Sequence, residues 1–324
     1  MEIIKILLRG ASQVMFQNNI WCGLLFMIGI FWGSYETGYG IVGWGALLGV
    51  IVSTATGFLL DLPESDGKEG LWGFNGILVG CAFPTFMGNT IFMWLSLILC
   101  SMLCTWVRTG FNNMLAPYKV NSFTFPFVFT TWIFLLSSRA MDGFGHPGLP
   151  NLGVADVSPF MQYDIISLLE YWLKGISQVF LVNSWITGAL FLIGLFISNK
   201  WAGIWAAVSS AIALFIAIIF QASGSDITGG LYGFSAVLTG IALGMTFYTV
   251  NIRSAIWAIL GVIVTVFIQA AMNVFLGPVG IPTLTGPFCI ATWLFLLPLF
   301  KFDKVDLPNH SSWKGKIEEL IHDK

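Results

Sequence analysis

The sequence contains little charge. Asp, Glu, Lys and Arg make up only 9% of its 324 residues, against roughly 25% in an average soluble protein. Hydrophobic residues make up 56%, and the mean hydropathy is +0.84. So few charged side chains do not cover the surface of a soluble globule, so the composition predicts a polytopic membrane protein. The formal net charge of −2 provides no basic surface, which argues against a nucleic-acid partner.

Histidine and cysteine are also scarce, with three and five residues. The sequence has no Cys-x-x-Cys pair and no Cys/His spacing typical of a metal site. Cysteines within apolar runs are usually small buried hydrophobes. All five lie in such runs: Cys22, Cys81, Cys100, Cys104 and Cys289. The sequence therefore predicts no disulfide, no metal and no cofactor.

Ionisable residues are almost absent from the apolar runs. Membrane enzymes and ion-coupled pumps depend on such groups at membrane depth. Here the acidic residues fall in connections, where we interpret them as solvated loop residues, and the histidines fall in a loop and the tail. A membrane enzyme and an ion-coupled transporter are therefore disfavoured. An aquaporin is disfavoured too, since paired Asn-Pro-Ala motifs are missing. A channel or carrier for a small neutral solute remains, and ammonia or ammonium is the alternative solute, although pore histidines are missing.

Long apolar runs dominate the rest of the chain. A membrane-spanning helix needs about 20 mostly apolar residues, and ten runs approach this length, so we predict an all-α fold. They lie near 20–34, 39–60, 71–87, 90–108, 121–138, 185–199, 201–220, 231–248, 252–275 and 284–300. Shorter polar-bounded stretches at 10–19 and 175–184 precede the first run of each half, and we interpret them as re-entrant half-helices.

Three blocks of the sequence occur twice in the same order. Residues 9–31 match 174–196 at 11 of 23 positions, residues 70–80 match 230–240 at 6 of 11, and residues 124–136 match 285–297 at 8 of 13. The offsets of 165, 160 and 161 indicate one duplicated unit. Five spans per unit is an odd number, so we expect the two copies to be inverted relative to each other. In such inverted repeats, solute sites form between the halves near the middle of the membrane.

The basic residues set the expected orientation. With the N-terminus in the cytoplasm, twelve of the fourteen Lys and Arg fall on that side, and only Arg139 and Lys174 fall outside. This is a strong positive-inside bias, so both termini are expected in the cytoplasm. Residues 1–10 show no cleavable signal pattern. The expected organisation is a first inverted repeat at 1–140, an extracytoplasmic loop at 141–168, a second inverted repeat at 169–300 and a cytoplasmic tail at 301–324.

Each half contains a Thr-x-Pro sequence, at 124–126 and at 285–287. Proline has no N–H and cannot donate to the carbonyl four residues earlier. We therefore expect the carbonyls of Ser122 and Thr283 to be unpaired and to face protein, water or a solute. A single break of this kind is usually only a kink, but two at equivalent places favour a shared pore.

Each half also repeats a Phe-x-x-x-Leu pair within a glycine-rich block: Phe74 with Leu78, and Phe234 with Leu238. The spacing puts each pair on one helix face, and the glycines allow close backbone approach. One such pair is usually ordinary packing, whereas two related pairs favour the walls of a narrow slot. Gln13 and Gln178 hold equivalent places in two Ser-Gln-Val sequences, where a helix cap and a pore-mouth role are equally plausible.

The IPTLTGPF sequence at 281–288, the two Gly-Phe-x-x-x-Leu blocks and the paired Ser-Gln-Val segments together resemble the urea transporter family over about residues 9–300. The resemblance implies a passive urea channel, in a bacterial inner (plasma) membrane, and not an enzyme. It implies ten spanning and two re-entrant helices around a pore in each subunit, three subunits per homotrimer, and surrounding lipid.

The resemblance also implies the residues that contact urea. They are Gln13, Val14 and Phe16 at the cytoplasmic mouth, Gln178 and Val179 at the outer mouth, Phe74, Leu78, Phe234 and Leu238 as slot walls, and Thr124 and Thr285 at the midpoint. Urea is planar and uncharged, with four N–H donors and one acceptor, and an unpaired buried donor costs about 1–3 kcal/mol. The expected pore therefore offers acceptors in series between phenyl walls, with no single deep site.

Overall fold

The computed structural model of the chain describes residues 2–145, 148–150 and 164–298, which form helices joined by short connections, without a β-strand among them. The first half contains α1 Glu2–Gln13, α2 Ile20–Glu36, α3 Ile41–Leu59, α4 Glu64–Lys68, α5 Phe74–Phe86, α6 Ile91–Leu115 and α7 Phe125–Ala140. The second contains α8 Ile165–Ser177, α9 Trp185–Ser198, α10 Lys200–Ile219, α11 Gly224–Thr228, α12 Gly233–Ile241, α13 Ile252–Leu276 and α14 Gly286–Leu296. Short 3-10 turns are η1 Ala116–Tyr118, η2 Asp142–Phe144, η3 Gln178–Phe180 and η5 Gly277–Val279, and the π-helix η4 Ala242–Thr246 extends α12.

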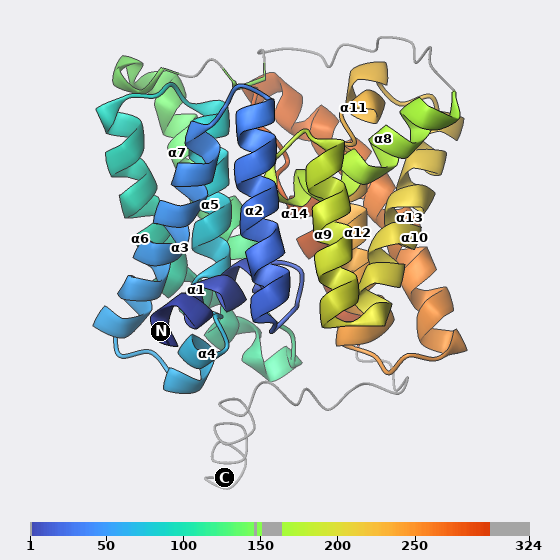
Figure 1. The fold of residues 1–324 in the computed structure, drawn as a ribbon, viewed down its shortest axis with the longest axis horizontal. Helices are drawn as coiled ribbons and strands as arrows, with labels where there is room; N and C mark the ends of the chain where they lie inside the picture. Colours follow the sequence, from blue (N-terminus) through green and yellow to red (C-terminus); the bar gives the residue numbers. More distant parts are fainter. Residues whose placement is uncertain (1, 146–147, 151–163, 299–324) are drawn as a thin grey trace, which may run out of the picture.

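The two halves lie side by side (Figure 1), with the first half on the left and the second on the right. Helices α1 and α4 lie toward the lower end, whereas α8 and α11 lie toward the upper end. Left-handed backbone recurs at matching non-glycine positions, Phe16 with Leu181 and Phe123 with Leu284. These features favour the inverted repeat, which stays a prediction together with its boundaries. The loop 141–168 lies partly, and the tail 301–324 wholly, outside the described residues.

Local sequence sets where the paired helices begin. The side chains of Asn19 and Ser184 accept backbone N–H groups from the first turns of α2 and α9, as good N-caps do. Helices α7 and α14 begin directly after Thr124 and Thr285, and each has a proline in its first turn. A proline there costs no helical hydrogen bond and has the backbone angle that a helix start needs.

Each of the ten predicted spans coincides with one apolar helix, but the helices differ in length. Within the described ranges four are long and apolar enough to cross a membrane: α3, α6 with η1, α10, and α13 with η5. Helices α2, α5, α7, α12 with η4, and α14 are shorter, and α8 meets α9 at a bend of 74°. Several of the ten apolar runs therefore form helices that are shorter than a full span. Helices that are buried against protein can end inside the membrane, where their ends find partners.

The two predicted re-entrant half-helices are misplaced by several residues. Helices α1 and α8 lie earlier in the sequence, and the predicted stretches contain their last turns and the chain reversals that follow. Ser12 Oγ donates to the carbonyl of Gln17 at 2.6 Å, and Ser177 Oγ donates to that of Val182 at 2.7 Å. The serines of the two Ser-Gln-Val sequences therefore close equivalent reversals.

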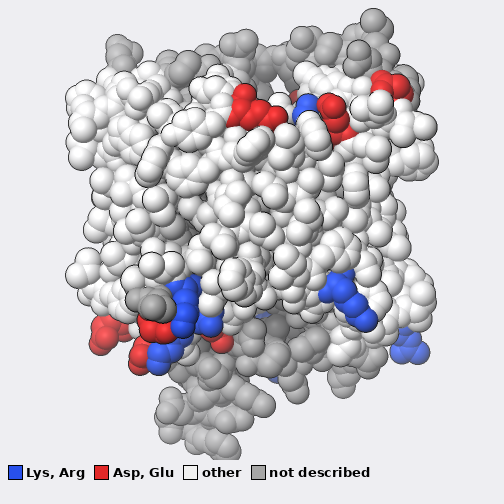
Figure 2. Space-filling model, in the orientation of Figure 1, with Lys and Arg blue, Asp and Glu red and all other residues white. Residues whose placement is uncertain are grey.

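On the face shown in Figure 2, a broad uncharged belt lies between two charged rims. Large apolar side chains are exposed on many helices, among them Trp44, Ile193 and Phe215. Exposure of these side chains to water would be unfavourable, whereas contact with lipid tails is favourable. The belt fits a multi-pass membrane protein, and which rim faces the cytoplasm stays a prediction.

Candidate functional site

The N-termini of α7 and α14 meet at the two predicted midpoint threonines. Thr124 lies at the residue before the first turn of α7, and Thr285 lies at the same place before α14. Their Oγ1 atoms are 2.6 Å apart, so one hydroxyl donates to the other, and each residue is only 2% exposed. Since each helix N-terminus carries a partial positive charge, two such charges converge on this contact. A solute that passes between the threonines must replace their hydrogen bond with its own.

The carbonyls before the prolines are not unpaired, so that expectation is wrong. The carbonyl of Ser122 accepts the N–H of Phe125 at 3.0 Å, and that of Thr283 accepts the N–H of Gly286 at 3.1 Å. The reason is that each proline lies in the first turn of a helix and does not interrupt one. A carbonyl oxygen has two lone pairs, so each can still accept one further N–H.

Two tryptophans fix the segments that precede the threonines across the two halves. Trp132 Nε1 donates to the carbonyl of Pro282 at 2.9 Å, and Trp293 Nε1 donates to that of Asn121 at 2.9 Å. The two bonds hold equivalent places in the repeat, and each joins a helix of one half to the segment of the other. They therefore position both threonines against each other.

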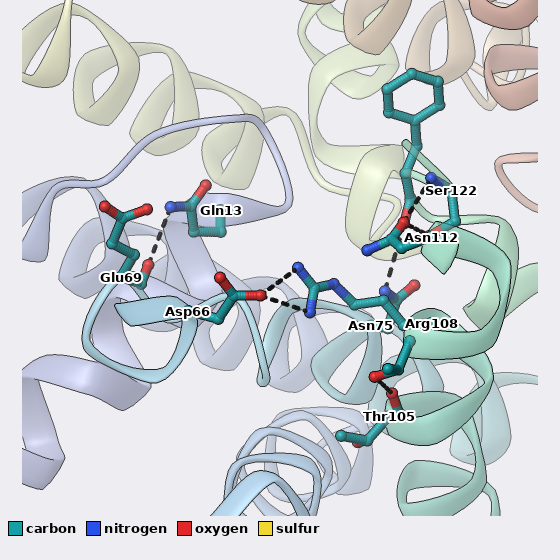
Figure 3. A network of polar contacts seen from close by, with 10 residues as sticks. Gln13, Asp66, Glu69, Asn75, Thr105, Arg108, Asn112 and Ser122 are labelled. Carbon is teal, nitrogen blue, oxygen red and sulfur yellow. Dashed lines mark hydrogen bonds and ion pairs between the residues drawn. The ribbon is translucent and has the colours of Figure 1, made fainter. Parts of the chain in front are cut away.

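In the first half two asparagines also hold this segment (Figure 3). Asn112 Oδ1 accepts the backbone N–H of Ser122 at 2.9 Å and its hydroxyl at 2.7 Å. Asn75 Oδ1 accepts the N–H of Phe127 at 3.1 Å. Sequence reasoning missed both asparagines, because a single amide in an apolar run does not show which distant backbone group it binds.

The predicted slot residues are all buried within one apolar cluster. Leu78, Leu238 and both phenylalanines, Phe74 and Phe234, belong to this cluster. Phe74 lies beneath the guanidinium of Arg108, and Phe234 contributes to a cavity. Their role as facing walls stays a prediction.

A cavity of about 570 Å³ lies beside α11. This cavity, called the α11 cavity below, includes the exposed Asn183 and Ser225 in its lining, so it opens to the surface. Gln178 lines it and donates from Nε2 to the carbonyl of Gly229 at 2.9 Å. Leu181 and Leu284 line it as well. Val179, the other predicted residue of this mouth, is buried in the core and does not line the cavity.

The opposite end of the predicted route is built from phenyl rings. The Phe16 ring contacts those of Phe123, Phe247 and Phe288 edge to face, with centroid separations of 6.3, 5.7 and 5.9 Å. Gln13 Nε2 donates to the carbonyl of Glu69 at 3.0 Å (Figure 3), as its counterpart does in the α11 cavity. Val14 is buried in the core. The two mouths therefore share their glutamines but differ in their apolar side chains.

The charges of Asp66 and Arg108 are not solvated, which corrects the sequence interpretation. Arg108 lies inside α6, which continues past the predicted end of that span. Its Nη1 and Nη2 donate to Asp66 Oδ2 at 3.3 and 3.2 Å (Figure 3), and the residues are only 6% and 8% exposed. The sequence predicts that the span ends at Arg108, and it contains no local pattern that shows the pairing of Arg108 with Asp66, 42 residues earlier.

Comparisons with known proteins agree on one family. The family model described as urea transporter matches residues 4–300. Urea transporter 1 of Ovis aries is 28% identical over 308 residues, which cover 92% of this chain and 77% of that protein. Urea transporter 1 of Rattus norvegicus is 27% identical over 305 residues, with the same shares covered.

Proposed function

The chain belongs to the urea transporter family, and on this premise we propose the route that urea takes through it. The protein transports urea passively and is not an enzyme. We place the route between the two halves, from the α11 cavity past Thr124 and Thr285 to the phenyl cluster around Phe16. The two repeats at 1–140 and 169–300 contribute equally to it.

One observation supports the route most directly. It is the hydrogen bond between Thr124 and Thr285, where α7 and α14 begin. Helix N-termini attract electronegative groups and repel cations. The urea carbonyl oxygen is favoured there, and a threonine hydroxyl can donate to it or accept from a urea N–H. An ammonium ion loses its hydration at this point and meets two partial positive charges. This disfavours ammonium, the alternative solute.

The other predicted residues serve the two approaches to the threonines. Ser122 and Thr283 offer the second lone pairs of their carbonyls to urea N–H groups. We propose that urea then contacts apolar and amide side chains on each side: Gln13, Val14, Phe16, Phe74 and Leu78 on one, and Gln178, Val179, Phe234 and Leu238 on the other. Several weak sites in a row favour conduction, since no single site holds the solute for long.

The assembly and its setting complete the proposal. We place the chain in a homotrimer in which each subunit has its own pore and lipid surrounds the uncharged belt. The membrane is the plasma (inner) membrane, and both termini lie in the cytoplasm, as the positive-inside bias indicates.

Stopped-flow light scattering on proteoliposomes tests the route. We expect urea to equilibrate much faster than in protein-free liposomes, and methylammonium to gain little. Thr285→Val lowers urea permeability, whereas Thr292→Val leaves it unchanged. Thr292 is a matched control, since it lies on the same helix and its buried hydroxyl has no hydrogen-bond partner in the described part of the chain. Equal permeability of the Thr285→Val variant and the wild type would show that urea does not pass here.

A further inference from the structure

The first half contains an occupied guanidinium site. The Arg108 guanidinium donates twice to Asp66 Oδ2, at 3.3 and 3.2 Å. Its Cζ also lies 5.6 Å from the centre of the Phe74 ring. A carboxylate on one side and a phenyl face on the other are the two partners that a planar guanidinium prefers.

The second half keeps this frame but has no arginine in it. The offsets of the repeat place Asp226 at the position of Asp66, Phe234 at that of Phe74, and Gln269 at that of Arg108. The glutamine is shorter and neutral. All three second-half residues line the α11 cavity. In the first half, Asp66 and Phe74 flank the Arg108 guanidinium, whereas these three residues border open space.

The amides around Asp226 do not replace the missing cation. Gln269 Nε2 donates elsewhere, to Asn273 Oδ1 at 2.9 Å and to Thr283 Oγ1 at 2.7 Å. Asp226 Oδ2 accepts only a long bond of 3.4 Å from Asn273 Nδ2, among the side chains that the structure describes. Lys174, on the neighbouring α8, donates to the carbonyl of Thr228 and forms no ion pair with Asp226 in those residues.

Gln269 gives a second, independent sign of a ligand that donates hydrogen bonds. The residue is 3% exposed and lines the cavity, and its Oε1 has no donor in the described part of the protein. A buried acceptor without a partner costs about 1–3 kcal/mol. Burial also raises the pKa of the Asp226 carboxyl, because desolvation disfavours its charged form. A cation rich in N–H groups would give Gln269 Oε1 a donor and would stabilise the charged form of the Asp226 carboxyl.

We propose that the α11 cavity binds a guanidinium-type planar cation between the carboxylate of Asp226 and the ring of Phe234, with Gln269 Oε1 accepting one of its N–H groups. This goes beyond urea transport, although the cation has the shape of urea. The cation does not continue along the route, because the helix N-termini at Thr124 and Thr285 repel it. A bound guanidinium therefore blocks urea.

Isothermal titration of the purified full-length protein in detergent tests binding without reference to urea flux. Guanidinium chloride is titrated at millimolar concentrations, far below the molar range in which it unfolds proteins, with sodium chloride as the ionic control. We expect saturable binding that Asp226→Asn weakens about tenfold or more. Gln269→Arg abolishes it, since the new side chain supplies its own guanidinium. Asp61→Asn, which removes the same charge next to α4, leaves it unchanged.

Saturable binding that persists undiminished in both Asp226→Asn and Gln269→Arg would overturn the proposal, as would its absence from the wild type. In proteoliposomes, guanidinium slows urea equilibration. The urea permeability of each variant is divided by its own value without guanidinium. The guanidinium concentration that halves this ratio is then about tenfold higher for Asp226→Asn than for the wild type. Entry of guanidinium itself through the protein would refute the block. A protein that binds guanidinium but does not conduct urea contradicts the proposed route and leaves this site standing.

Discussion

Replacing the two midpoint threonines by valine, singly and together, separates their structural role from their role in conduction. Thr285→Val keeps the shape of the side chain but, among the described residues, leaves the buried Thr124 hydroxyl with only Cys289 Sγ, 3.4 Å away. An unsatisfied buried hydroxyl costs about 1–3 kcal/mol, whereas replacing both partners of a hydrogen bond by apolar groups is nearly neutral. Each single variant should therefore be less stable than the double variant.

Urea conduction should respond in the opposite order. With one hydroxyl left, urea still finds one polar partner at the midpoint, and with none its carbonyl is stranded between two methyl groups. Losing one hydrogen bond at about 1.4 kcal/mol slows passage about tenfold. Losing both slows it roughly a hundredfold, if the two hydroxyls act on urea independently.

Thermal unfolding in detergent, followed by tryptophan fluorescence, measures the stability of each variant. Stopped-flow urea permeability at equal protein content measures its conduction. Thr292→Val is the control, since its hydroxyl is buried on α14 without a partner in the described chain. The reasoning fails if the double variant conducts urea like the wild type. It also fails if permeability follows stability across the three variants.

Three further changes test other parts of the structure. Asp66→Asn leaves the buried Arg108 charge without its partner and should lower the free energy of unfolding by about 3–5 kcal/mol. The unfolding midpoint should fall accordingly, and adding Arg108→Gln should partly restore it. Phe16→Leu removes one ring from the phenyl cluster and should raise urea permeability; an unchanged rate would place the narrowest point elsewhere. Gly230→Ala should destabilise the fold, because its φ of 71° is left-handed and a Cβ would lie 2.5 Å from the N of Gly175. Gly38→Ala, with a similar φ of 78° but open space around it, should cost only about 1 kcal/mol in the same unfolding assay.

The sequence predicted the helices and the midpoint pair because both leave local signals. Apolar runs mark helices in a membrane protein whatever their tertiary contacts are. The two Thr-x-Pro sequences also occupy equivalent places, so any fold with symmetric halves brings Thr124 and Thr285 into comparable positions. Their hydrogen bond across the halves follows from that symmetry. The role of the pair in conduction still rests on the resemblance and on the proposed route.

Features that depend on distant partners were not predictable. Charge normally marks the end of a span, and the prediction ended one at Arg108, whereas Asp66 from a separate short helix allows that charge to be buried. The sequence predicts that the prolines break helices, whereas in the structure they lie in the first turns of α7 and α14. Several helices are shorter than a full span for a related reason: helices that end against other helices find partners for their terminal groups inside the protein.

The halves are alike at the midpoint and unlike at the mouths, and the physics of the route accounts for this. On the proposed route, a solute at the midpoint lies equally between two helix N-termini, so the same hydroxyl serves from either side. In the proposed orientation, each mouth faces only one side of the membrane. One mouth has a buried, internally neutralised guanidinium and a phenyl cluster, and the other has an open cavity lined by Asp226 and Gln269. A passive route for a neutral molecule does not need matching mouths, because direction comes only from concentration. Asp226, which forms no ion pair among the described residues, is therefore explained by the proposed guanidinium and not by urea.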